Sequence, residues 1–211
     1  MEEIKDYTLQ DYLEYRKMLE EYVSERSDIV FLNDSRVHAV MVLTAMLTQL
    51  KTAEKREDRL LKMFCGEFSL FRDTTKRHLS VLEKEYESEF KAENMSWADF
   101  DPYGKLQQAL ESFFKNQGRL ELIVTSNPLP MKDEDSWEFF SNAIQTGRMK
   151  VWQYSNDFCL DHFSVAGSAY RIENSDEEKT AICCFNDAPT ARKLAESFDS
   201  IKGNSRRVLT A

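Results

Sequence analysis

The segment HFSVAGSAYRIEN, residues 162–174, predicts how the last third of the chain folds. Apolar and polar residues alternate on either side of Gly167-Ser168, as they do in two short strands joined by a turn. The segment KTAICCFN, residues 179–186, has a similar composition and follows the polar stretch NSDEE. The sequence therefore predicts three consecutive short strands.

A helix is expected directly after these strands, over DAPTARKLAESFDSI at 187–201. Asp187 has the side chain of an N-cap residue, and Pro189 suits the first turn. Ala191, Leu194 and Phe198 fall on one face, which predicts an amphipathic helix packed on the sheet.

The N-terminal third predicts a helix, a strand and a second helix. Thr8 and Asp11 have the spacing of a capping box at the start of a helix that continues to about residue 25. DIVFLND at 28–34 is a strand candidate, and the apolar segment at 35–50 indicates a buried helix. RLLKMFCGEF at 59–68 is the next strand candidate, so we interpret this region as a βαβ unit.

Two segments in the middle of the chain have the same organisation. Residues 103–126 and 136–155 each contain an amphipathic helix, a glycine (Gly118 or Gly147) and then an apolar strand. Glycine at the end of a helix is typical of a short helix-to-strand connection. These repeated units predict an α/β fold with a mixed, mostly parallel sheet flanked by helices.

The domain organisation expected from this pattern is simple. A chain of 211 residues is long enough for one full core. Residues 1–27 are expected to form an N-terminal helix packed on the domain, and residues 28–202 a single α/β domain. Residues 203–211 are expected to form a basic C-terminal tail, which contains Arg206 and Arg207.

Composition narrows the classes of function. The chain carries 31% charged residues and a net charge of −9, which predicts a soluble, acidic protein. No apolar run approaches the roughly 20 residues of a membrane span, and the N-terminus lacks a secretory signal pattern, so the expected location is the cytoplasm. The acidic balance disfavours nonspecific nucleic-acid binding, because lysine and arginine supply most of that affinity.

No cofactor or metal ion is expected. The six glycines are dispersed and form no phosphate-binding loop. The four cysteines form no C-x-x-C pair, so we expect reduced thiols. Cys159 and His162 have a spacing seen among zinc ligands, but no second pair completes a site.

The segments 162–174 and 180–201 together resemble the C-terminal part of a half-domain of the phospholipase D superfamily. That resemblance implies a histidine on a strand that attacks phosphorus, paired with the histidine of a second copy that protonates the leaving group. It also implies a lysine two residues after the histidine, on the same strand face, to stabilise the phosphate oxygens. His162 matches the histidine of this H-x-K-x4-D signature.

At the other positions of the signature, this sequence differs from the family. Ser164 stands at the lysine position and Ala169 at the aspartate position. Residues 176–179 read DEEK where the family has a G-S-x-N segment. A serine cannot replace a cation facing a phosphate, so the departure puts the implied chemistry in doubt.

The candidate catalytic residues are therefore His162 and Ser164, and the candidate binding residues are Arg171, Glu173 and His38. Arg171 and Glu173 share a strand face, where they form either an anion contact or a cross-face ion pair. His38 lies one turn into a helix whose N-terminus favours anions, or is a polar residue satisfied by a neighbour inside a buried helix. His162 is either a reactive group or a packed strand residue.

Three functions remain open. The first is a divergent phospholipase D-like protein that has lost catalysis and acts as a binding or regulatory module. The second is an active phosphodiesterase or nuclease, which needs a homodimer because one chain supplies one such histidine. The third is an unrelated α/β interaction protein. The expected partners are accordingly a second copy, another protein or a phosphodiester ligand, and no membrane.

Overall fold

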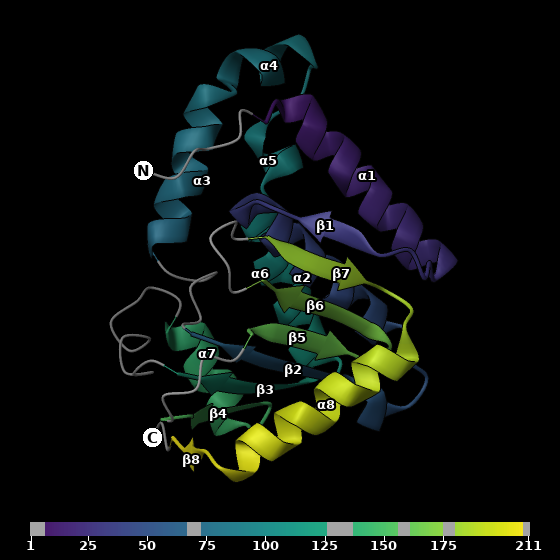
Figure 1. Cartoon of the computed structure of the whole chain (residues 1–211). Coiled ribbons are helices and arrows are strands. Elements are labelled where there is room, and N and C mark those ends of the chain that lie inside the picture. The colour runs from purple at the N-terminus through teal and green to yellow at the C-terminus, as the bar shows by residue number, and fades with distance from the viewer. Residues whose placement is uncertain (1–6, 67–72, 126–136, 156–160, 175–179, 209–211) are drawn as a thin grey trace.

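The computed structural model describes residues 7–66, 73–125, 137–155, 161–174 and 180–208. They build one eight-stranded sheet with helices on both faces (Figure 1). The strands are β1 (Phe31–Asn33), β2 (Leu60–Cys65), β3 (Arg119–Val124), β4 (Met149–Gln153), β5 (Phe163–Ala166), β6 (Ala169–Glu173), β7 (Ala181–Cys184) and β8 (Arg206–Arg207).

The strand order is β1-β7-β6-β5-β2-β3-β4-β8. Strands β2, β3 and β4 pair in parallel, as the two repeated helix-to-strand units predict. The other five neighbouring pairs are antiparallel. The α/β class is confirmed, but the prediction of a mostly parallel sheet is wrong. Short connections between β5, β6 and β7 allow only antiparallel pairing, because a parallel pair needs a long crossover.

The first strand is also placed differently from the expected βαβ unit. Strand β1 runs in the same direction as β2 but is not its neighbour, because β5, β6 and β7 lie between the two. It pairs with β7, with Leu32 opposite Ile182. The connection through helix α2 therefore carries the chain from the edge of the sheet to its centre.

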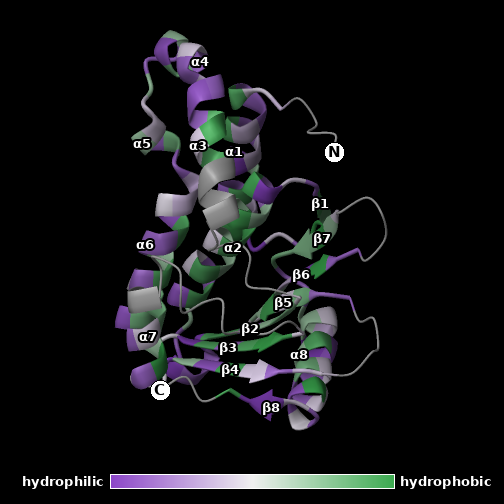
Figure 2. Cartoon of the chain, turned by 90° about the vertical axis from the view of Figure 1, so that its left-hand side faces the viewer, coloured by the Kyte–Doolittle hydropathy of each residue, from purple (hydrophilic) through white to green (hydrophobic). Residues whose placement is uncertain are grey.

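Eight α-helices are described, together with a short 3₁₀ turn at Arg56–Asp58. They are α1 (Leu9–Glu25), α2 (Arg36–Lys51), α3 (Asp73–Glu85), α4 (Glu87–Ala92), α5 (Trp97–Phe100), α6 (Pro102–Lys115), α7 (Trp137–Gln145) and α8 (Ala188–Gly203). Helices α2, α6 and α7 lie on one side of the sheet and α8 on the other (Figure 2). Helices α1, α3, α4 and α5 extend the first layer beyond the β1 edge (Figure 1).

Each face of the sheet has its own apolar core. The larger core joins the sheet to α2 and α6 through fully buried residues such as Met46, Leu61 and Leu106. The smaller core, beneath α8, contains Phe64, Phe163 and Phe198. Alternate residues of a strand point to opposite faces, so β2 contributes Leu61 to the first core and Phe64 to the second. No described helix is both long and apolar enough to cross a membrane.

The helix starts that the sequence predicts are present. Thr8 and Asp11 form a capping box at α1, with the Thr8 amide donating to Asp11 Oδ2 over 2.8 Å. Asp187 caps α8 by accepting from the Thr190 amide at 3.1 Å. Residues 206–207, expected in the basic tail, add to β4 as β8, and Arg206 donates to Gln153.

Gly118 ends helix α6 for a different reason from the one that the pattern suggests. The left-handed residue is Gln117, with φ +67°, whereas Gly147 itself adopts φ +69° after α7. A Cβ added at Gly118 would lie 2.4 Å from the Phe113 ring. Glycine is required at 118 by this close approach of a fully buried ring.

We expect Gly118→Ala to lower the free energy of unfolding by about 1–3 kcal/mol, because the Phe113 ring must leave its position in the core. Gly203→Ala is the matched control, since an added Cβ there meets nothing within 4 Å. Urea unfolding of both variants measures the difference. Equal stabilities for the two variants would contradict this account of residue 118.

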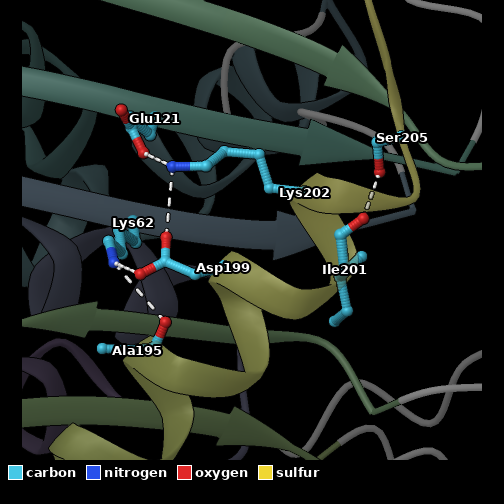
Figure 3. A network of polar contacts seen from close by, with 7 residues as sticks. All are labelled: Lys62, Glu121, Ala195, Asp199, Ile201, Lys202 and Ser205. Atoms are coloured by element: carbon cyan, nitrogen blue, oxygen red, sulfur yellow. Dashed lines mark hydrogen bonds and ion pairs between the residues drawn. The ribbon is translucent and has the colours of Figure 1, made fainter.

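Helix α8 is fixed to the sheet by a chain of charged groups (Figure 3). Lys62 on β2 donates to Asp199 over 2.8 Å, and Lys202 contacts both Asp199 at 3.1 Å and Glu121 at 2.8 Å. Lys62 and Lys202 also lie 5.5 and 5.7 Å from the centre of the Phe198 ring. Burial opposes the charge of Asp199, but bonds from the two lysines outweigh it and lower its pKa.

Asp199→Ala is expected to destabilise the protein more than Glu196→Ala does. The first substitution leaves the largely buried Lys62 ammonium without its carboxylate, whereas Glu196 is exposed on the same helix. Thermal unfolding at pH 7 gives the comparison. A melting temperature for Asp199→Ala equal to that of Glu196→Ala would show that the charged chain contributes nothing to docking of α8.

Candidate functional site

Four side chains form a connected polar group across three strands. His162 immediately precedes β5, Arg171 and Glu173 lie on β6, and Asn33 ends β1. His162 Nδ1 lies 3.1 Å from Glu173 Oε2, and Arg171 pairs with the other carboxylate oxygen. Arg171 Nε donates to Asn33 Oδ1 over 2.9 Å. We call His162, Glu173, Arg171 and Asn33 the His162 group.

The sheet places these side chains together for a geometric reason. The Glu173 amide donates to the His162 carbonyl over 2.7 Å, so the two residues are directly opposite on antiparallel strands. Arg171 is two residues before Glu173 and therefore points to the same face. That face is the one covered by α2, and β1 brings Asn33 to it from the edge.

The electrostatics of the His162 group are nearly balanced. Burial alone would raise the pKa of Glu173, but the bond from His162 and the charge of Arg171 outweigh it and lower this pKa from 4.5 to about 2. Because an ionised carboxylate only accepts hydrogen bonds, His162 Nδ1 carries a proton. In neutral His162, Nε2 is then left as the acceptor.

The His162 ring is partly exposed, with 35% of its side chain accessible, and it lies close to the carboxyl ends of β2 and β3. A Cβ added at Gly66 would lie 3.0 Å from His162 Cε1 and 3.8 Å from Thr125 Oγ1. Phe64 meets the ring edge-on at 5.7 Å between centroids. Carboxyl ends of parallel strands are the usual place for ligands in open α/β sheets.

Ser164 occupies the position where the resemblance implies a lysine. It is 5% exposed and lies in register with Arg171 on one side and Met63 on the other. Ala169 is fully buried at the turn between β5 and β6. Among the described residues, the cation of the His162 group is Arg171, whose guanidinium is already held by Glu173 and Asn33.

His38 belongs to another environment. Its Nδ1 lies 3.0 Å from Asp34 Oδ1, and the Tyr15 ring stacks on it with 3.7 Å between centroids. Ser35 Oγ accepts from the His38 amide, so the side-chain cap occupies this amide of the α2 N-terminus. The structure therefore places His38 between α1 and α2, among aromatic rings, and not with His162.

Several predicted features lie outside the described residues. These are Cys159 and residues 176–179, and the side chain of His78, the third histidine of the chain, also lies outside them. Within the described ranges, no group of three His, Cys, Asp or Glu residues comes together as a metal site. Burial raises the pKa of the Cys65 thiol, which lies near Glu173, so this cysteine stays protonated at neutral pH.

Asn33 is the member of the His162 group that the sequence does not reveal. Its contact with Arg171 spans 138 positions and depends on β1 pairing with β7. A polar residue at the end of a strand candidate is by itself a common helix-start signal, so no local pattern marks it.

No protein-family model and no curated protein matches this chain. TrmBL2, an archaeal chromatin protein whose structure shows a novel mode of DNA binding, is similar with a TM-score of 0.53 and 11% identity over 95% of this chain. This chain spans 65% of the length of TrmBL2.

Two further solved structures are similar at lower scores. Nuc from Salmonella typhimurium, a phospholipase D family member, has a TM-score of 0.48 and 10% identity over 86% of this chain and 99% of its own. NucT from Helicobacter pylori has a TM-score of 0.44 and 8% identity, covering 85% and 98% of the two chains. At these identities the likeness concerns the fold alone.

The pair formed by His162 and Glu173 makes stability depend on pH. Because the Glu173 pKa is lowered on folding, its ionised form stabilises the protein above about pH 4.5, and this contribution is lost as the pH falls towards about 2. We expect the stability difference between the wild type and Glu173→Gln to shrink over that range in urea unfolding. A constant difference from pH 6 to pH 2 would contradict the pairing.

Proposed function

We propose that this protein is a divergent phospholipase D-like module that binds a partner and does not cleave phosphodiesters. The observation that carries the proposal is that Ser164 stands where the resemblance implies a lysine. Ser164 is buried beside Arg171, and Arg171 is already bonded to Asn33. A phosphate entering next to His162 would meet no spare positive charge in the described part of the site.

The charge balance supports the same proposal. Arg171 and Glu173 form an ion pair, so the guanidinium supplies no net positive charge to a ligand beside His162. A phosphorane-like transition state needs donors and cations aimed at its oxygens, and a neutral hydroxyl is a weak substitute for an ammonium group. Moving Arg171 towards a ligand would break its contacts with both Glu173 and Asn33.

One observation favours the alternative of an active phosphodiesterase. A carboxylate that holds His162 Nδ1 leaves Nε2 free to accept a proton or attack phosphorus, as in many acid–base sites. This arrangement supplies an oriented histidine without the cation. The alternative therefore requires that a second subunit bring both a second histidine and positive charge to the same site.

A direct assay separates the two. We expect no metal-independent hydrolysis of bis(p-nitrophenyl) phosphate or single-stranded DNA above the buffer rate, and no change for His162→Ala. Hydrolysis that His162→Ala abolishes and His78→Ala leaves intact would overturn the proposal. Retained circular-dichroism spectra of both variants show that the comparison concerns folded protein.

A further inference from the structure

Three arginines stand at the amino ends of the three parallel strands. Arg59 immediately precedes β2, Arg119 begins β3, and Arg148 immediately precedes β4. The backbone places them side by side, because the Arg119 amide donates to the Arg59 carbonyl and the Leu120 amide to the Arg148 carbonyl. Neighbouring strands are about 4.8 Å apart, so the three Cα atoms lie within roughly 10 Å of one another. We call Arg59, Arg119 and Arg148 the arginine row.

Two guanidinium groups of the arginine row are fixed next to each other. Arg59 Nη1 donates to the Asn116 carbonyl over 3.0 Å. Arg148 Nη1 donates to the following carbonyl, that of Gln117, over 3.2 Å. Both carbonyls lie directly after α6, and the end of a helix favours a nearby positive charge. This contact explains the direction of two of the three side chains.

Arg119 extends the row to a second segment of backbone. Its Nη2 donates to the Glu57 carbonyl over 3.0 Å, in the 3₁₀ turn that precedes β2. Arg119 is exposed and Arg148 is half-buried. Among the described contacts, each of these two side chains uses one of its five N–H groups. The other N–H groups are available to a ligand.

The arginine row keeps its positive charge, in contrast to Arg171. The partners of the row are backbone carbonyls, which carry no net charge, whereas Arg171 is paired with the Glu173 carboxylate. Glu57 and Asp58 are exposed beside the row, and within the described part of the chain no ion pair joins them to it. The three cations are therefore held in place without a counter-charge.

The residues around the row are also basic. Residues 115–119 and 148–150 contain four cations and no carboxylate, although the net charge of the chain is −9. Like charges that are held close together repel one another, and a bound anion relieves this repulsion. A local positive patch of this kind also attracts anions from solution.

We propose that the arginine row binds an acidic peptide segment of a partner protein. The planar guanidinium group matches a carboxylate with two parallel hydrogen bonds. Alternate side chains of an extended peptide lie on one side of it, about 6.6 Å apart. Two or three such carboxylates therefore match the length of the row.

The charge of the chain favours a short acidic segment over a nucleic acid. Affinity for a nucleic acid grows with the number of phosphates that lysine and arginine neutralise. A strand longer than the row would extend over a protein whose net charge is −9. A peptide with a few carboxylates needs only the cations of the row.

This surface is separate from the His162 group. The row lies at the amino ends of β2 and β3, whereas His162 lies beside Gly66, after β2 ends. Six residues of strand span about 20 Å, so one ligand residue cannot contact both places. The peptide site therefore goes beyond the proposed function and does not depend on the chemistry of His162.

Fluorescence anisotropy with a labelled hexaglutamate peptide tests the proposal. We expect the wild type to bind this peptide in about 50 mM salt and to bind it more weakly as salt is added. The double variant Arg119→Gln/Arg148→Gln should bind at least about tenfold more weakly. Lys17→Gln/Lys84→Gln is the matched control, because it removes the same charge from exposed positions on α1 and α3. Its affinity should equal that of the wild type.

A second double variant separates binding from folding. Arg119→Lys/Arg148→Lys keeps both charges and loses the two-pronged guanidinium geometry. We expect its affinity to lie between those of the wild type and the glutamine variant. Circular-dichroism melting curves of all variants identify any loss of folded protein. If the glutamine variant does not fold, a folded lysine variant that binds as tightly as the wild type would contradict the role of the guanidinium groups.

Three results would overturn the proposal. They are a dissociation constant above about 1 mM for the wild type, equal affinities of the folded glutamine variant and its control, and tighter binding of a twelve-nucleotide thymidine strand than of hexaglutamate. The last result would assign the row to nucleic acid. Phosphodiester hydrolysis that His162→Ala abolishes would overturn the proposed function alone, and peptide binding by His162→Ala would then support the peptide site independently.

Discussion

The antiparallel pairing of β5 with β2 is the contact on which the arrangement depends. It joins the parallel strands β2, β3 and β4 to the antiparallel run of β5, β6 and β7, so that one sheet results from two kinds of connection. Phe163 opposes Phe64 across this junction, and both side chains enter the core beneath α8. The same pairing brings His162 to the carboxyl end of β2, where Gly66 leaves room for the ring.

Local signals in the sequence were sufficient to predict most elements. The capping residues Thr8 and Asp187, the hairpin around Gly167 and the helix-to-strand units before β3 and β4 all depend on neighbouring residues. Strand order depends on contacts between distant segments, and no local pattern encodes which edge a strand joins. For that reason the sequence predicted β1 correctly as an element but placed it next to β2 by assuming a compact βαβ unit.

In the candidate site, too, the sequence predicts what depends on neighbouring residues and not what depends on distant contacts. Arg171 and Glu173 could be assigned to one face from their spacing alone, and His162 from its place at the head of β5. Their hydrogen bonds require the register of β5 against β6, and the link to Asn33 requires the β1–β7 pair as well. Whether Arg171 is free to bind an anion depends on the tertiary structure. The partners that already hold its guanidinium are Glu173 on β6 and Asn33 on β1, near the other end of the chain.

The position of β1 decides what its two faces contact. Asn33 lies on the face towards α2 and bonds to Arg171, whereas Leu32, the residue before it, points to the opposite face beside Ile182. Because the side chains of a strand alternate, the face of β1 that carries Leu32 is opposite to the face on which Asn33 bonds to Arg171. The β1 edge is therefore linked to the His162 group through one strand, by the hydrogen bond that Arg171 donates to Asn33.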